Sequence, residues 1–247
     1  MAEDTMLLKD KVALVTGATR GIGRAISLAF ASEGANLIVC ARTARLVQEF
    51  ANEIRAGGRK CLGVVAAVEQ EADVNRMVEE ALAMFGRIDV LVNNAGISNP
   101  KPFLETTMAD WDETLNINLR GVILCMRAVL PDMLRRGAGK VINISSAAGV
   151  RGLPGSPAYA ASKAAVIALT QAVGDELLGK GVLLNVVCPG AIRSELLDRS
   201  PVKNFVIGNP ATVLEVEDVA GMALYLASDL CGRLSSQILV VKNSNRW

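Results

Sequence analysis

The sequence contains no histidine, and this absence restricts the chemistry that the protein can perform. Histidine is the most common general base and the most common metal ligand in proteins. Any proton transfer must therefore use tyrosine, lysine, cysteine or a carboxylate. Aromatic residues make up only 4% of the chain, and just two of them are tyrosines, Tyr159 and Tyr225.

Cysteine pairs of the kind that bind metal are absent as well. The five cysteines are odd in number, widely scattered, and include no C-x-x-C pair. Scattered cysteines are typical of small buried hydrophobic residues in a reducing compartment. We therefore predict no metal site and no disulfide framework for Cys40, Cys61, Cys125, Cys188 and Cys231.

An excess of one charge and long apolar runs are also lacking. The 26 basic and 25 acidic residues leave a net charge of +1, without a run of either sign that would attract nucleic acid or an anionic membrane. No stretch reaches the roughly eighteen uncharged apolar residues of a membrane span, and residues 1–11 lack the apolar core of a signal peptide. We predict a cytoplasmic protein without membrane or nucleic-acid partners.

What the chain does contain is a regular alternation of two patterns. Short apolar runs predict buried parallel strands at 11–16, 36–41, 61–67, 88–94, 140–145, 182–188 and 237–242. Between them, amphipathic periodicity predicts helices at 22–33, 44–57, 70–86, 109–136, 157–179 and 217–228. This order predicts an α/β fold, a doubly wound parallel sheet of about seven strands with helices on both faces.

The length and the periodicity also predict how the chain is organised. At 247 residues and 51% hydrophobic, residues 1–247 can form a single domain around one core, and no linker interrupts them. The stretch 194–214 has no clear period, and we predict that it is a substrate-covering flap. Ligands of such a sheet bind beyond the carboxyl ends of the strands.

The first predicted strand runs directly into "TGATRGIG", residues 16–23, which opens a helix. Glycines at 17, 21 and 23 let the backbone turn tightly and approach a pyrophosphate, whose charge the helix N-terminus would meet. The spacing differs from the common G-x-G-x-x-G fingerprint, because three residues separate the first two glycines. A plain strand-to-helix turn is the alternative.

Tyr159 and Lys163 lie four positions apart in the predicted helix that Ser156 and Pro157 begin. Residues at this spacing share a helix face, so the two side chains can meet. At about 5 Å and an effective dielectric of about 20, the ammonium would favour a phenolate by roughly 3 kcal/mol, or about two pKa units. We predict that Lys163 lowers the pKa of Tyr159. The alternative is a tyrosine packed on the sheet beside a solvated lysine.

Three motifs together resemble the short-chain dehydrogenase/reductase family. They are T-G-x-x-x-G-x-G at 16–23, "NNAG" at 93–96 and Tyr-x-x-x-Lys at 159–163, and the resemblance extends from about residue 9 to 241. Within the family, the chain resembles the 3-oxoacyl reductases in a general way. The resemblance implies a Rossmann-type fold, a nicotinamide dinucleotide, and hydride transfer between a carbonyl and an alcohol.

The resemblance implies four catalytic residues: Asn118, Ser146, Tyr159 and Lys163. Ser146, in "NISSAAG", would donate a hydrogen bond to the substrate oxygen, and Ser145 would support the site structurally. In the family, an asparagine at the position of Asn118 kinks its helix and helps hold a water that connects the lysine to solvent. There are two alternatives: Asn116 has this role instead, or Asn118 is an ordinary exposed amide.

The charge pattern favours NADP(H) as the cofactor. The end of the second predicted strand reads "VCARTAR", without the carboxylate that would pair with the ribose hydroxyls of NAD. Arg20 and Arg42 could instead clamp the 2′-phosphate of NADP. Taken singly, each is more often a solvated surface residue. With the contacts that the family resemblance implies, the predicted cofactor residues are Gly17, Thr19, Arg20, Gly21, Ile22, Gly23, Arg42, Val68, Asn94, Ala95, Gly96, Tyr159, Lys163, Pro189, Gly190, Ile192 and Ser194.

Two departures from the family pattern stand out. Ala67 takes the place where the family commonly has an aspartate that contacts the adenine amine. Lys242, Asn243 and Ser244 replace the usual Asp-Gly-Gly near the C-terminus, a region that often packs at subunit contacts. The resemblance implies a homo-oligomer, a dimer or a tetramer, and the altered tail puts the tetramer in doubt.

The sequence therefore predicts an NADP(H)-dependent oxidoreductase that acts on a small-molecule carbonyl or secondary alcohol, with Tyr159 as the proton donor or acceptor. The alternative is a regulatory or scaffolding protein of the same fold that binds the cofactor without turnover. Acyl-carrier thioesters, steroids, sugars and small diketones all stay open as substrates.

Overall fold

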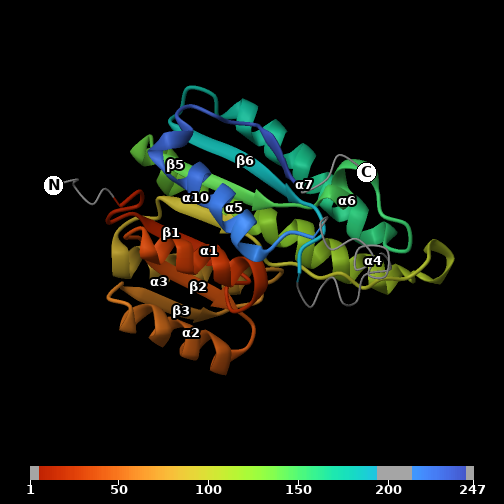
Figure 1. Ribbon diagram of the computed structural model, residues 1–247, viewed down its shortest axis with the longest axis horizontal. Coiled ribbons are helices and arrows are strands. Elements are labelled where there is room, and N and C mark those ends of the chain that lie inside the picture. The colour runs from red at the N-terminus through yellow and green to blue at the C-terminus, as the bar shows by residue number, and fades with distance from the viewer. Residues whose placement is uncertain (1–5, 194–212, 243–247) are drawn as a thin grey trace.

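The computed structural model describes residues 6–193 and 213–242 and shows one seven-stranded sheet (Figure 1). All strand pairs are parallel, and the strand order is β3-β2-β1-β4-β5-β6-β7. The strands are β1 (Val12–Thr16), β2 (Asn36–Ala41), β3 (Cys61–Val65), β4 (Val90–Asn93), β5 (Gly139–Ile144), β6 (Val182–Pro189) and β7 (Ile238–Val241). The doubly wound α/β fold is confirmed.

Helices cover both faces of the sheet. The strand residues alternate between two core clusters, so that Ala13 and Val15 of β1 face one cluster while Val12 and Leu14 face the other. The first cluster includes α1 (Gly21–Ser32), α2 (Ala44–Ala56) and α10 (Val216–Ala227), and the second includes α3 (Glu71–Phe85), α5 (Gly121–Arg136) and α7 (Pro157–Glu176). Within the described part of the chain, no helix has the length and apolarity that a bilayer crossing needs.

The predicted single helix over 109–136 is wrong, because the chain is distorted in the middle of it. The structure has α4 (Met108–Leu115), then a π-helical turn over Asn116–Arg120, then α5. Asn118 in this turn bonds the backbone of Ile97, and a Cβ on Gly121 would lie 2.7 Å from Val68 Cγ2. These contacts reach far along the sequence, so helical periodicity could not reveal the break.

Three short elements also escaped the sequence prediction. They are η1 (Phe103–Glu105), α6 (Ala147–Arg151) and η4 (Asp229–Cys231), each too short to show a period. Of these, α6 matters for function, since it directly follows the end of β5.

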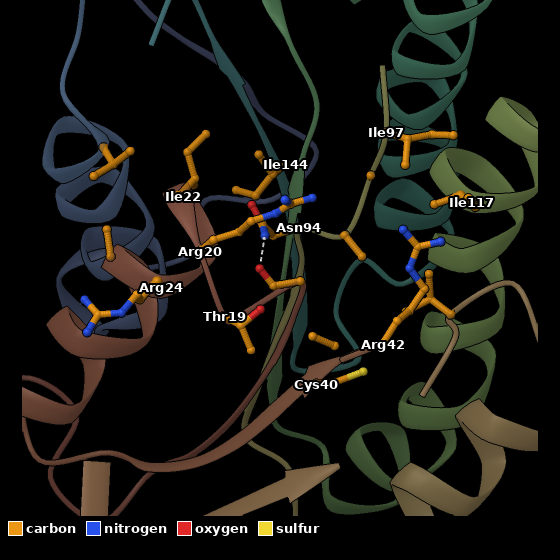
Figure 2. Close-up of a pocket in the computed structure, with 18 of the residues that line it drawn as sticks. Thr19, Arg20, Ile22, Arg24, Cys40, Arg42, Asn94, Ile97, Ile117 and Ile144 are labelled. Atoms are coloured by element: carbon orange, nitrogen blue, oxygen red, sulfur yellow. Dashed lines mark hydrogen bonds between the residues drawn. The ribbon is translucent and has the colours of Figure 1, made fainter. Parts of the chain in front are cut away.

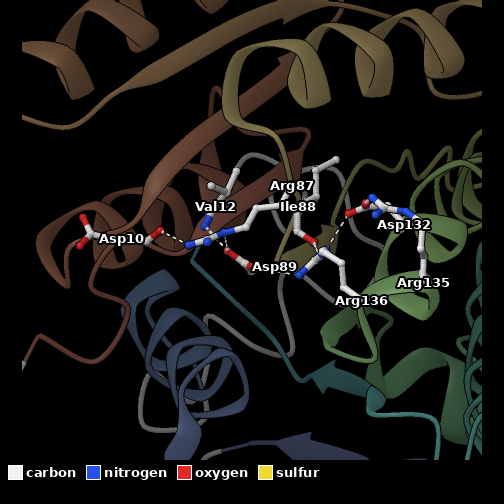
Figure 3. Close-up of polar contacts among 8 residues, drawn as sticks. All are labelled: Asp10, Val12, Arg87, Ile88, Asp89, Asp132, Arg135 and Arg136. Atoms are coloured by element: carbon white, nitrogen blue, oxygen red, sulfur yellow. Dashed lines mark hydrogen bonds and ion pairs between the residues drawn. The ribbon is translucent and has the colours of Figure 1, made fainter.

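A charged network ties together the amino ends of the central strands, opposite the edge where ligands of such sheets bind (Figure 3). The Asp89 carboxylate accepts hydrogen bonds from Val12 N at 2.9 Å, Arg87 Nε at 2.9 Å and Arg136 Nη1 at 3.2 Å. Arg136 also donates to Ile88 O at 2.6 Å. Because the Asp89 side chain is only 14% exposed, this network fixes α5 to β1 and β4.

The chain on either side of residues 194–212 is held together by backbone pairing. Ile192 and Leu214 form a parallel bridge, Arg193 N donates to Leu214 O at 2.9 Å, and Leu214 N donates to Ala191 O at 2.9 Å. The flap predicted over 194–214 lies almost wholly outside the described residues, as do Ser194, Asn243 and Ser244.

Candidate active site

A cavity of about 630 Å³ opens at the carboxyl edge of the sheet (Figure 2). Its wall comes from the ends of β1 to β5, from α1 and α7, and from the start of α10. The predicted residues that line it are Gly17, Thr19, Arg20, Gly21, Ile22, Arg42, Val68, Asn94, Ala95, Gly96, Tyr159 and Lys163. The structure thus brings most of the predicted cofactor residues to one place.

The glycine loop is packed so tightly that side chains are excluded at two positions. Gly17 has a φ of +63°, and a Cβ there would lie 2.9 Å from Ala95 Cα. A Cβ on Gly23 would lie 2.3 Å from Gly17 O. The Asn94 amide donates to Thr16 O at 3.0 Å and to Gly17 O at 3.1 Å, so this side chain holds the loop in place.

The N-terminus of α1 is left open toward an anion. Arg20 is the N-cap residue, but its side chain makes no capping hydrogen bond, and no acidic residue stands in the first turn. The first amides of α1 and the positive end of its dipole are therefore available to a phosphate, which fits a dinucleotide.

Both arginines predicted to select the cofactor border the same cavity. Figure 2 shows Arg20 extending toward Asn94, and Arg42 extending toward Ile117. A third arginine, Arg24, is engaged elsewhere, since its guanidinium contacts both carboxylate oxygens of Glu53 at 2.6 and 2.7 Å.

Lys163 is buried beside the end of β5. Its side chain is 5% exposed, and Nζ donates to Ile144 O at 2.9 Å. Ser145 Oγ donates to Lys163 O at 2.7 Å, which holds α7 against β5 as expected for a supporting residue. Burial lowers the pKa of Lys163 to about 8, because the charged form loses its hydration.

Tyr159 shows an electrostatic effect opposite to the one we predicted. Burial raises its pKa, and the nearby Ser146 side chain opposes that rise only in part. Lys163 Nζ lies 5.8 Å from the centre of the Tyr159 ring and donates to a backbone carbonyl. The prediction weighed the ammonium without the burial, and burial is the larger effect in this protein.

Ser146 stands where β5 meets α6, and its side chain is near enough to Tyr159 to lower the pKa of that phenol. It is the N-cap of α6, and its Oγ accepts a hydrogen bond from Ala148 N at 3.1 Å. A Cβ on Gly149 would lie 2.6 Å from the carbonyl carbon of Lys163, so α6 and α7 are in close contact. This packing brings the turn that carries Ser146 against the helix that carries Tyr159 and Lys163.

Asn118 is fully buried, which rules out an ordinary exposed amide. Its Oδ1 accepts from Ile97 N at 2.8 Å, and its Nδ2 donates to Ile97 O at 2.9 Å and to Ser162 Oγ at 3.0 Å. The side chain therefore joins the π-helical turn, the segment after β4 and α7.

Some predicted cofactor residues do not form part of the cavity wall. They are Gly23, packed against the glycine loop, and Pro189, Gly190 and Ile192, at and after the end of β6. Ser146 and Asn118 are not among the lining residues either. The residues that we did not predict and that do line it are Arg24, Ala25, Leu28, Cys40, Ala41, Thr43, Leu46, Ala66, Glu69, Ile97, Ile117, Ile144, Ser145, Arg193, Val216 and Glu217. Arg24, Ala25 and Leu28 follow Gly21 at helical spacing, and that signal could have identified them.

Fold and site together define a Rossmann-type nucleotide-binding protein with a tyrosine, a serine and a lysine gathered beside the nucleotide cavity. The family profile described as short chain dehydrogenase matches residues 11–203. The chain therefore belongs to the short-chain dehydrogenase family, whose members are nicotinamide-dependent oxidoreductases.

Individual relatives match along nearly the whole chain. A subunit of (2S)-[(R)-hydroxy(phenyl)methyl]succinyl-CoA dehydrogenase from Thauera aromatica is 37% identical over 240 residues, 96% of each chain. A 3-oxoacyl-[acyl-carrier-protein] reductase from Synechocystis sp. is 40% identical over 230 residues, 90% of this chain and 91% of that one. Among solved structures, levodione reductase is similar with a TM-score of 0.90 and 31% identity, covering 96% and 97% of the two chains.

Proposed function

We propose that the protein transfers a hydride between NADP(H) and a carbonyl or secondary alcohol substrate, with Tyr159 as the proton donor or acceptor. The observation that carries this proposal is the gathering of Tyr159, Ser146 and the buried Lys163 beside one cavity that fits a dinucleotide. With no histidine in the chain, this hydroxyl pair is the natural carrier of the proton.

The roles of the residues follow from their positions. When bound, a reduced nicotinamide supplies the hydride. The hydroxyls of Ser146 and Tyr159 hydrogen-bond the carbonyl oxygen, and Tyr159 donates its proton as negative charge develops there. The raised pKa of Tyr159 keeps the phenol protonated before reduction. Lys163 supplies positive charge next to Tyr159 and binds the nicotinamide ribose, and Asn118 fixes the turn beside both.

The choice of NADP(H) rests on charge. Arg20 and Arg42 border the cavity, and Ala41 rather than an acidic residue ends β2. A 2′-phosphate carries close to two negative charges, which the two guanidinium groups can pair with. NADPH should therefore bind more tightly than NADH.

The substrate class is proposed from the relatives alone. Two of them carry names of reactions on coenzyme A or acyl-carrier-protein derivatives, and a third is named for levodione. We propose an acyl thioester with a 3-oxo group as the first substrate to test, and a cyclic diketone as the second.

The decisive experiment compares Tyr159→Phe with Tyr225→Phe, the substitution of the only other tyrosine in the chain. Oxidation of NADPH is followed by absorbance with each carbonyl compound, and NADPH binding is measured separately. We expect the wild type and Tyr225→Phe to turn over, and Tyr159→Phe to bind NADPH but lose activity by about a hundredfold or more. Full activity of Tyr159→Phe would refute the mechanism. NADPH binding without turnover on any compound would favour the regulatory or scaffolding alternative.

A further inference from the structure

Arg24 borders the cofactor cavity, but its side chain is directed away from it. The residue follows Arg20 by one turn of α1, and both residues line the cavity wall. Figure 2 shows the Arg24 guanidinium extending away from Thr19 and Arg42. The protein therefore has a further guanidinium beside the cavity that does not face it.

Two contacts hold the Arg24 guanidinium, and both come from α2. Its Nη2 donates to the two carboxylate oxygens of Glu53 at 2.6 and 2.7 Å, and its Cζ lies 5.1 Å from the centre of the Phe50 ring. Phe50 belongs to the core and is 3% exposed, so the ring is a fixed surface for the guanidinium. To face the cavity, Arg24 would have to give up both contacts and leave the charge of Glu53 without a partner.

Glu53 itself is not part of the cavity wall. The residues of α2 and its N-cap that line the wall are Leu46 and Thr43. Glu53 follows Leu46 by two helical turns, about 10 Å along the helix axis, and lies on the same face. The ion pair therefore draws the Arg24 side chain along α2, from the cavity wall toward the later part of the helix.

The ion pair also changes the charge that a bound phosphate would meet. Arg20 and Arg42 border the cavity, and Arg24 would add a third guanidinium to these two if it turned toward the phosphate. In its pair with Glu53, the charge of Arg24 is cancelled nearby. The side chains of the pair are 40% and 47% exposed, so Arg24 can move once the carboxylate is removed.

We propose that Glu53 limits the affinity of the protein for NADP(H) by keeping Arg24 away from the 2′-phosphate. Glu53 thus sets the strength of cofactor binding without touching the cofactor. A weaker hold on the 2′-phosphate favours release of the used cofactor, which every turnover requires. This inference rests on the proposed NADP(H) cofactor, and neither Glu53 nor Arg24 takes part in the chemical step.

The test compares the dissociation constants of NADPH and NADH in the wild type and in Glu53→Ala, measured by nucleotide fluorescence without substrate. The two nucleotides differ only in the 2′-phosphate, so an effect on the rest of the cofactor changes both constants alike. We expect Glu53→Ala to bind NADPH about fivefold or more tightly than the wild type, because Arg24 gains a charge-assisted contact with the phosphate. The dissociation constant of NADH should stay within about twofold of the wild-type value.

Two comparisons separate the release of Arg24 from the loss of a negative charge in general. Glu49→Ala removes a carboxylate one turn earlier on α2, where it pairs with Arg45 at 2.7 Å, and should leave both constants at their wild-type values. In an Arg24→Met background, Glu53→Ala should no longer tighten NADPH binding. Melting temperatures without nucleotide check that each variant folds, and Glu53→Gln replaces Glu53→Ala should the latter not fold.

The possible failures can be told apart. If neither nucleotide binds to the wild type, or both bind with equal constants, the proposed NADP(H) dependence fails and this inference fails with it. If the wild type prefers NADPH but Glu53→Ala leaves that dissociation constant unchanged, the cofactor proposal stands and the Glu53 inference is overturned. Tighter NADPH binding that persists in the Arg24→Met background would also overturn it, because the loss of charge alone would then be the cause.

Discussion

Asn118 and Ser162 lie 44 positions apart in the sequence, and a hydrogen bond of 3.0 Å joins Asn118 Nδ2 to Ser162 Oγ. Ser162 Oγ in turn donates to Tyr159 O at 2.7 Å. Both side chains are fully buried. Through Ser162, the π-helical turn is therefore linked to the turn of α7 that carries Tyr159.

We expect Ser162→Ala to reduce kcat about three- to tenfold with little change in the dissociation constant of NADPH. The substitution leaves one amide hydrogen of Asn118 without a partner, which should also cost about 1–2 kcal/mol of stability. Steady-state kinetics and urea unfolding measure the two effects. Ser32→Ala is the control, because Ser32 Oγ donates only to Ala29 O on the exposed side of α1. A fall in NADPH affinity with unchanged kcat would speak against the positioning role.

Arg42→Ala should change the cofactor preference. Loss of one charge-assisted contact to the 2′-phosphate should raise the KM for NADPH about tenfold and leave the KM for NADH nearly unchanged. Arg45→Ala is the matched control on α2, since the Arg45 guanidinium is 72% exposed and pairs with Glu49 at 2.7 Å. Two results would contradict the proposed contact of Arg20 and Arg42 with the 2′-phosphate. One is an equal rise in the KM for NADPH and NADH in Arg42→Ala, and the other is a similar kcat/KM of the wild type with both cofactors.

The stability of the protein should depend on pH through Lys163. Its pKa is about 8 in the folded protein and 10.5 in the reference state. Below pH 8, folded and unfolded chains both hold the proton, and the folded state bears the cost of the buried charge. Between about pH 8 and 10.5 the unfolded chain binds more protons, so the free energy of unfolding rises with pH, by up to about 3 kcal/mol.

Lys163→Met should lack this rise. Urea unfolding of both proteins at several pH values between 7 and 10 gives the difference in the free energy of unfolding. Tyr159, whose pKa is raised by burial, remains in both proteins. Because Lys163 and Cys188 shift each other's pKa, the comparison is made in a Cys188→Ala background. If the difference in the free energy of unfolding between the wild type and Lys163→Met stays constant over this range, the Lys163 amine keeps an ordinary pKa.

The strand positions could be predicted from the sequence alone, because buried parallel strands are continuous apolar runs. The runs predicted at 36–41 and 140–145, for example, correspond to Asn36–Ala41 and Gly139–Ile144. The family resemblance implied a kink at Asn118, but the periodicity over 109–136 did not show it, since the break depends on contacts of Asn118 with Ile97 and of Gly121 with Val68. Helical periodicity is a local property, and these contacts are long-range.

The sequence predicted which residues form the site, but not the direction in which the pKa of Tyr159 is shifted. Spacing placed Tyr159 and Lys163 on one helix face, but the direction of the pKa shift depends on how much water the fold removes from each group. The cavity wall likewise draws on residues from β2 and the π-helical turn, which come together only in the folded chain.

The backbone pairing between Ile192 and Leu214 has a consequence for how such enzymes diversify. Because the two ends of the intervening stretch already meet, the entropy of closing it grows slowly with length, at about 0.6 kcal/mol for each doubling. Evolution, or a protein engineer, can therefore lengthen, shorten or transplant the stretch from a relative while the sheet and the cofactor cavity stay as they are. Under the prediction that 194–214 covers the substrate, chimeras joined at 193 and 213 should exchange substrate preference.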